Sequence, residues 1–167
     1  YDLITEYRKN PIGLTDKAPR FSWKIESQEK DTLQTSYEIS VIDENGKVVW
    51  NSGKRASDQS VLVDYEGETL ETEMLYKVEV SVTDNHGNTA STEGTFETGI
   101  LDNAEFIAKM LTSDFPAEET ACPVFVKTFA LDKKVKKARL YATAHGVYEV
   151  TFNGQTVGDY RMAPGWT

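Results

Sequence analysis

Alternation of apolar and polar residues with a period of two is the feature that most constrains the fold of this chain. It runs through four stretches of the N-terminal part, at 21–25, 37–41, 61–65 and 76–82. Successive side chains of a β-strand point to opposite faces, so this pattern is typical of strands with one buried face. No stretch of this part shows a comparable stripe with the 3.6-residue period of a helix. The sequence therefore predicts an all-β fold.

Turn residues separate the predicted strands. Asn-Gly dipeptides stand at 45–46 and 153–154, and residues 84–88 read Asp-Asn-His-Gly-Asn. Asn and Gly tolerate the positive φ of tight hairpins, so each segment indicates a turn. About six or seven short strands joined in this way are typical of a small antiparallel sandwich. We expect residues 1–99 to form such an antiparallel β-sandwich.

Residues 100–167 form a second predicted unit. After a Pro-containing loop at 114–123, strands are expected over 124–131, 140–144, 148–152 and 157–160. Nothing after these strands covers their apolar faces, and a sheet with one apolar face needs a second layer. We therefore expect this unit to be the incomplete start of a β domain. Three outcomes would relieve the open edge: packing back onto the first sandwich, partial disorder, or association of two copies. Because an open sheet edge is a template for another chain, we expect association as a homodimer through this edge.

Composition excludes some classes of partner. The 167 residues include 27 acidic and 18 scattered basic residues, for a net charge of −9, which disfavours binding to nucleic acid or to an anionic membrane surface. Cys122 is the single cysteine, so no intrachain disulfide forms. Residues 1–20 show no secretory pattern, and no apolar run approaches the ~20 residues of a membrane span. These features predict a cytoplasmic location.

The three tryptophans are candidates for stacking on sugar rings. Trp23 and Trp50 lie on the apolar side of alternating strands, where packing in the core is the ordinary role of an aromatic residue. We predict that both are buried in the sandwich. Trp166 follows Pro-Gly, and this sequence context does not distinguish packing in the core from stacking on a sugar.

Acidic residues are abundant, but abundance does not make the facing pair that glycoside hydrolysis needs. Five glutamates fall on the polar faces of predicted strands, where solvation is expected: Glu6, Glu26, Glu38, Glu79 and Glu149. We assign no catalytic or substrate-binding residue in this chain.

Metal and cofactor motifs are also missing from the sequence. His86, His145 and Cys122 do not have zinc-site spacing, and residues 84–88 lack the spacing of an EF-hand loop. His86 is expected to belong to its turn, and Cys122 to be a buried or inert thiol. The sequence holds no phosphate-binding loop, dinucleotide fingerprint or nucleophile elbow, so we expect no metal and no cofactor.

Blocks along nearly the whole chain resemble the N-terminal region of bacterial α-L-rhamnosidases. In order, they are Asn-Pro-Ile-Gly-Leu at 10–14, Pro-Arg-Phe-Ser-Trp at 19–23, and the segments 34–37, 49–54, 138–149, 153–158 and 163–167. The family often has Trp where this chain has Phe106 and Met110, so the match is weaker at the junction of the two units.

The resemblance implies a fold and a function. In this family a fibronectin-III- or immunoglobulin-like sandwich, which residues 1–99 would form, precedes a jelly-roll-like β domain, which residues 100–167 would begin. A further β domain, an α/α barrel with the acidic catalytic residues and a small β domain would follow. The family is regarded as inverting, with a general acid and a general base on the barrel, and none of those residues has a counterpart here. The parent enzyme would release terminal α-L-rhamnose from plant glycosides or polysaccharides, and this part would position the downstream domains.

Two other functions compete with this interpretation. A stand-alone sugar-binding module would use exposed aromatic residues, and an adhesion module could use the same fold, since such sandwiches serve many functions. Solvent exposure of the tryptophans would favour sugar binding, whereas burial would favour a scaffold.

Overall fold

The computed structural model describes residues 1–116, 118 and 121–165. It divides the chain into two compact units, Tyr1–Ile107 and Ala108–Thr167, which are described one at a time.

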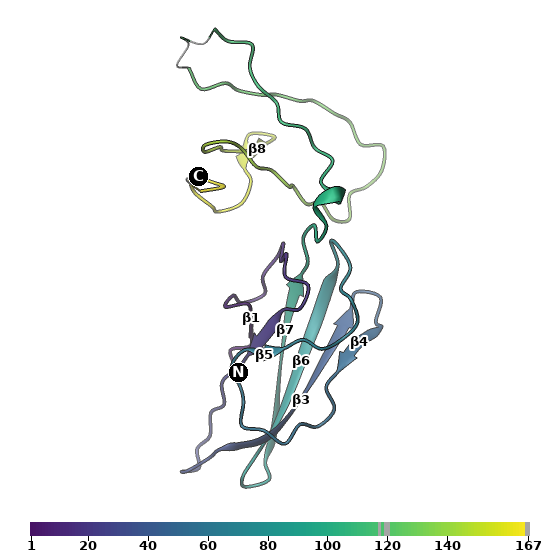
Figure 1. Cartoon of the computed structure of the whole chain (residues 1–167), viewed down its shortest axis with the longest axis vertical. Helices are drawn as coiled ribbons and strands as arrows, with labels where there is room; N and C mark the ends of the chain where they lie inside the picture. The colour runs from purple at the N-terminus through teal and green to yellow at the C-terminus, as the bar shows by residue number, and fades with distance from the viewer. Residues whose placement is uncertain (117, 119–120, 166–167) are drawn as a thin grey trace. The chain divides into compact units, whose positions relative to one another are not determined.

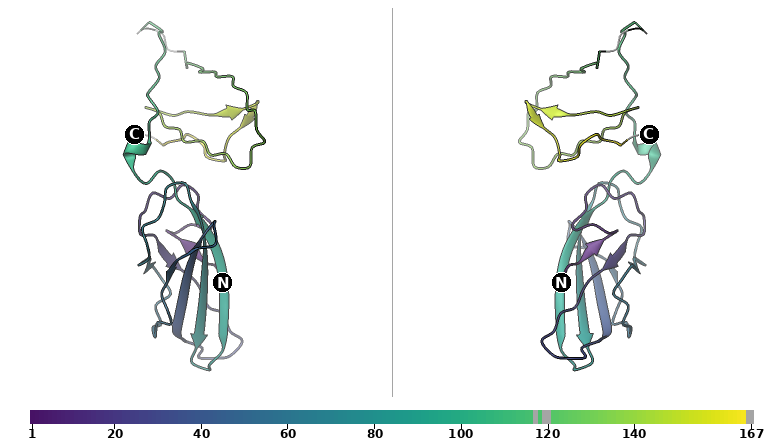
Figure 2. Two further views of the ribbon diagram at one scale, coloured as in Figure 1. Left: turned by 90° about the vertical axis from the view of Figure 1, so that its right-hand side faces the viewer. Right: turned by 90° about the vertical axis from the view of Figure 1, so that its left-hand side faces the viewer.

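The first unit is a sandwich of two antiparallel sheets (Figures 1 and 2). The larger sheet has the order β4-β3-β6-β7, formed by β4 (Val48–Asn51), β3 (Gln34–Asp43), β6 (Leu75–Asp84) and β7 (Thr89–Glu97). The smaller sheet has the order β1-β2-β5, formed by β1 (Ile4–Thr5), β2 (Arg20–Ser22) and β5 (Val63–Asp64). A 3₁₀ turn, η1 (Asn103–Glu105), follows β7. The predicted all-β sandwich is confirmed.

The core lies between the sheets because the period-two pattern places one face of each long strand there. On β3, Ile39 and Val41 are fully buried, and β6 brings Val80 and Val78 opposite them. Phe21 of β2 is also fully buried and covers this layer from the smaller sheet. Burying each such side chain is worth roughly 1.5–3 kcal/mol, so these strands supply much of the hydrophobic stabilisation.

Aromatic rings fill the space toward the ends of the sandwich. The Trp50 ring stacks on Phe21 at 6.2 Å between centroids and meets Tyr65 edge-on at 5.3 Å. Burial raises the pKa of Tyr65 to about 12, and its hydroxyl donates to the Glu68 carbonyl at 2.7 Å. A Cβ at Gly67 would lie 2.5 Å from Trp50 and Tyr65 atoms, so this packing admits only glycine there.

Two hairpins of the larger sheet use the same turn chemistry. In the β3–β4 turn, Asp43 Oδ1 accepts the amides of Asn45 and Lys47, and Gly46 takes a φ of +86°. Asp84 repeats this in the β6–β7 turn, where Gly87 has a φ of +84°. An aspartate that bonds its own turn and a glycine at positive φ are what such turns require, so both predicted turns are confirmed.

Residues 10–14, one of the blocks that resemble rhamnosidases, run along the edge of β7 that faces away from β6. We call this segment the strap. The Asn10 side chain accepts the Thr95 amide at 3.0 Å, and the Pro11 carbonyl accepts the Glu97 amide at 2.9 Å. A Cβ at Gly99 would lie 3.1 Å from the strap backbone, so glycine permits the close approach. The strap closes the β7 edge at Thr95 and Glu97.

The second unit contains one small hairpin. It pairs β8 (Thr151–Phe152) with β9 (Gln155–Thr156), and Asn153 and Gly154 both take positive φ, 50° and 80°. Both angles are those of the type I′ turn that the Asn-Gly dipeptide predicted.

The structure differs from the sequence prediction at the other strands expected in this unit. Over 121–165, which the structure describes, no strand forms at 124–131, 140–144 or 157–160, and none of these residues is buried. Val124 and Val126 are each 84% exposed. A strand with one apolar face is stable only where that face is covered, and the apolar faces of these segments are not buried, so alternation alone did not produce strands.

We expect Trp23→Ala and Trp50→Ala each to lower the free energy of unfolding of the first unit by about 3–5 kcal/mol, because each leaves a cavity among packed rings. The melting temperature should fall by more than about 10 °C. Leu33→Ala, at a side chain that is 66% exposed, is the matched control and should change stability by less than about 0.5 kcal/mol. Equal melting temperatures for all three variants would contradict the packing described above.

Candidate functional site

Two of the three tryptophans are placed by the structure, and both are buried as predicted. Trp23 is 3% exposed and Trp50 is 8% exposed. The Trp23 ring packs edge-on against Tyr37, and its Nε1 donates to Gln34 Oε1 at 2.9 Å. Neither ring is exposed enough to serve as a stacking surface for a sugar, which favours the scaffold interpretation. Trp166 lies outside the described residues.

Glu6 corrects one expectation, because it is not solvated on a strand face. β1 ends at Thr5, Glu6 takes a φ of +44°, and its side chain is only 11% exposed. Arg20 donates to both of its carboxylate oxygens, through Nε at 2.9 Å and Nη2 at 2.8 Å. These hydrogen bonds from Arg20 hold the pKa of Glu6 below its usual value, and the pKa of Arg20 is raised in turn. The pair fixes the turn after β1 and leaves no free carboxylate.

The other four glutamates lie on separate elements. Glu38 is on β3 and accepts from Asn51, and Glu79 is on β6 and pairs with Lys77 at 2.7 Å. Glu149 belongs to the second unit, and Glu26 is an exposed residue after β2. Three of the four are exposed and Glu79 is half-buried, so their places on polar faces agree with the pattern.

The candidate metal-binding residues have other roles. Asp84 Oδ1 accepts two amides of its own turn and Oδ2 accepts Asn88 Nδ2 at 3.1 Å, so both oxygens are engaged. His86 belongs to this turn as expected, whereas Cys122 is exposed, so of the two expectations, a buried or an inert thiol, the buried one is wrong. Among the described residues, no three His, Cys, Asp or Glu side chains form a group that could hold a metal ion. Within the same ranges, no helix has the length and apolar composition needed to cross a membrane.

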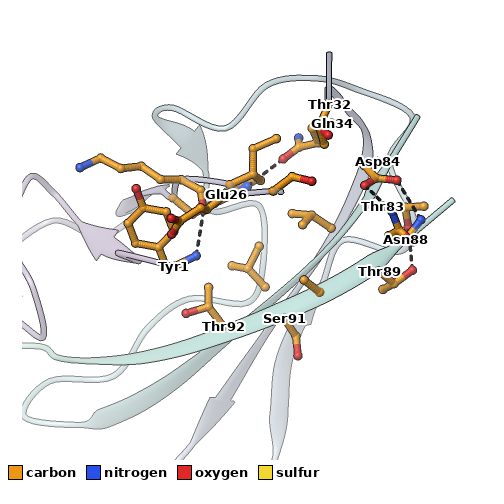
Figure 3. A pocket seen from close by; sticks show the side chains of 17 residues that line it. Tyr1, Glu26, Thr32, Gln34, Thr83, Asp84, Asn88, Thr89, Ser91 and Thr92 are labelled. Atoms are coloured by element: carbon orange, nitrogen blue, oxygen red, sulfur yellow. Dashed lines mark hydrogen bonds between the residues drawn. The ribbon is translucent and has the colours of Figure 1, made fainter. Parts of the chain in front are cut away.

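A cavity of about 470 Å³ opens at the end of the sandwich near the β6–β7 turn (Figure 3). Val80, Val82 and Trp23 are among its lining residues, and they give it an apolar floor. Its rim carries hydroxyl and carboxyl side chains, among them those of Thr92, Asp84 and Glu26. Its size is in the range of small-ligand pockets.

The chemistry of this cavity suits contact and not catalysis. The Trp23 indole N–H and both oxygens of Asp84 are committed to internal hydrogen bonds. Lys24 pairs with Asp2 at 2.6 Å. Sequence reasoning missed the cavity, because it lies where the smaller sheet does not cover the inner face of β6 and β7.

Comparison with protein families finds two matches. The family model of the Rha78A-like N-terminal immunoglobulin domain matches residues 1–102. The model of the alpha-L-rhamnosidase N-terminal domain matches residues 133–167.

Curated relatives match along almost the whole chain. An alpha-L-rhamnosidase of Formosa agariphila is 34% identical over 98% of the chain and 19% of its own length. One from an Alteromonas species is 32% identical over 95% of the chain and 19% of its own length. The chain thus spans about a fifth of the length of the curated relatives it matches.

Solved structures of alpha-L-rhamnosidases also match this chain over a small part of their own length. The native alpha-L-rhamnosidase of Aspergillus terreus superposes with a TM-score of 0.79 at 26% identity, over 99% of this chain and 20% of that chain. The Streptomyces avermitilis alpha-L-rhamnosidase, solved with L-rhamnose, has a TM-score of 0.61 at 32% identity, over 65% of this chain and 11% of that chain.

The Glu6–Arg20 pair gives a pH-dependent prediction. Because the folded state lowers the pKa of Glu6 below 4.5, its contribution to stability is complete above that pH and is lost as the pH falls through the lowered value. Glu6→Gln should lower the free energy of unfolding by about 1.5 kcal/mol at pH 7, the low end for charged hydrogen bonds, since Arg20 is partly exposed.

Urea denaturation at pH 7 and at about pH 2.5, below the ordinary glutamate pKa, measures this effect. The difference between wild type and Glu6→Gln should shrink at the lower pH. Glu38→Gln, at an exposed glutamate, is the control and should have little effect at either pH. An undiminished difference at low pH would contradict the role of the charge.

Proposed function

Because the chain belongs to the Rha78A-like family through its N-terminal immunoglobulin domain, we propose that it is the N-terminal, non-catalytic part of an α-L-rhamnosidase. The observation that carries the proposal is the extent of the match. Relatives named alpha-L-rhamnosidase align with 95–98% of this chain but with only 19% of their own length.

The proposed activity belongs to the parent protein. Hydrolysis of a glycoside needs two carboxyl groups on either side of the scissile bond, and an inverting enzyme holds them roughly 6.5–9.5 Å apart with a water between. In this chain Glu6 is held by Arg20, and the remaining candidates lie on separate strands and loops. The general acid and general base would therefore come from outside residues 1–167. Terminal α-L-rhamnose of plant glycosides or polysaccharides is the proposed substrate.

The proposed role of this part is to position the domains that follow it. Trp23 and Trp50 are buried, two of its turns are held by their own aspartates, and Arg20 of β2 is tied to Glu6 after β1. Such a sandwich is rigid and presents few free functional groups, which suits a scaffold better than a sugar platform.

The purified chain should not hydrolyse a chromogenic α-L-rhamnoside above the rate of a mock preparation, because it lacks an acid/base pair. The full-length protein that contains it should release the chromophore and free L-rhamnose under the same conditions. As a control, the chain is added to an inactive sample of the full-length protein. Activity in this mixture would indicate a contaminating enzyme.

Either of two results would overturn the proposal. Hydrolysis by the chain alone would show that it carries a catalytic site. A full-length protein that cleaves other glycosides but not α-L-rhamnosides would contradict the assignment of the parent protein as an α-L-rhamnosidase.

For the isolated chain we also propose self-association through the second unit. Large apolar side chains there are exposed, with Val124 and Val126 as the extreme cases and Phe125, Phe129 and Leu131 more than half exposed. A two-fold dimer lets such a surface cover its own copy. Light scattering over a concentration series should therefore approach twice the 18.7 kDa of one chain. A constant monomeric mass at high concentration would contradict this.

A further inference from the structure

The strap shows how the edge of β7 accepts a second extended segment. Besides the amides of Thr95 and Glu97, the Gly99 amide donates outward, to the Leu14 carbonyl at 2.6 Å. Leu14 also forms a parallel bridge with Thr98. Three alternate amides at the end of β7 are thus satisfied by a neighbouring segment on the side away from β6.

The rest of the β7 edge continues this row without a partner segment. In an antiparallel pair, alternate residues direct their backbone groups to the same side. Since Thr95 and Glu97 face outward, Ser91 and Glu93 face outward too, and Thr92 faces β6, where it pairs with Val80. In the described part of the chain, no segment bonds the outward groups of these two residues from beyond the sheet.

The inner face beside this free edge is open as well. Leu3 covers β7 at Gly94, where an added Cβ would lie 3.3 Å from the leucine side chain. Beyond that point Ala90 is exposed, Thr92 is half-buried, and both line the cavity. Figure 3 shows Thr92 on the cavity side of β7 and Ser91 on the opposite side.

We propose that the free edge of β7, residues 89–94, is a docking site for an extended segment of the parent polypeptide from outside residues 1–167. The segment adds a strand next to β7, in line with the strap, and places every second side chain in the cavity. Main-chain hydrogen bonds give such β-augmentation its affinity, and the pocket for alternate side chains gives its specificity. This inference rests on the proposed function, because it takes the occupant from the four-fifths of the relatives' length that this chain does not span.

The cavity also indicates the chemistry of that segment. Apolar residues at alternate positions fit the floor formed by Val80 and Val82. Glu26 and Asp84 stand at the rim, whereas Lys24 is already paired with Asp2 and the N-terminal ammonium of Tyr1 donates to the Lys24 carbonyl. Neutral or basic side chains are therefore favoured over acidic ones. A segment of the same polypeptide also has a high effective concentration at the site, which a separate partner lacks.

Residue-resolved hydrogen exchange tests the inference on the isolated chain and on the full-length protein. In the isolated chain, the Ser91 and Glu93 amides should exchange roughly 100-fold faster than Thr92, whose N–H donates to β6. In the full-length protein both should slow by about the same factor. Ser91→Pro removes an outward N–H but no bond to β6, so it should restore fast exchange at Glu93, whereas Ser91→Ala should not.

A second pair of variants keeps the test decisive if Ser91→Pro unfolds. Ala90→Glu adds a charge on the cavity side and Ser91→Glu adds the same charge on the outer side. Only Ala90→Glu should restore fast exchange at Glu93 in the full-length protein.

Fast exchange of Ser91 and Glu93 in a full-length protein that hydrolyses α-L-rhamnosides would overturn the docking inference and leave the proposed function intact. Equal effects of Ala90→Glu and Ser91→Glu would also overturn it. Protection of β7 in a full-length protein without α-L-rhamnosidase activity would instead overturn the proposed function alone. Slow exchange of both amides already in the isolated chain would show that the edge is closed without the added segment.

Discussion

An apolar sheet face must be covered, and this constraint decides the state of each part of the molecule. In the first unit β3 and β6 place Ile39, Val41, Val78 and Val80 in one layer, and Phe21 of the smaller sheet covers it. All four aliphatic residues are at most 1% exposed. The tight turns and the buried rings depend on this layer, because they stabilise the fold only when the two sheets pack together.

Where the covering layer stops, the structure changes character. Past Leu3 the inner face of β6 and β7 opens into the cavity, and the strap no longer closes the β7 edge. In the second unit no described residue is buried. Its named strands within the described residues are β8 and β9, which have two residues each and form one hairpin. Both places fit a chain that forms one part of a longer polypeptide in its relatives.

The polar groups of the first unit serve its fold. Glu6 and Arg20 hold the turn after β1, Asp43 and Asp84 hold two hairpins, and Gln34 orients Trp23. Groups that are satisfied within the protein are not available to a substrate, and this supports the scaffold role that we propose. The proposed docking edge is different, because its backbone groups at Ser91 and Glu93 face away from the sheet.

The sequence by itself determined the strands of the sandwich, its hairpin turns and the burial of Trp23 and Trp50. These features follow from the alternation of side chains and from turn residues, which act over a few positions. Tertiary structure alone decided that Glu6 is buried against Arg20, that residues 10–14 form a strap on β7, and that 124–131 forms no strand. The reason is that a pattern tells which side chains share a face, whereas burial and pairing depend on partners far away in the sequence.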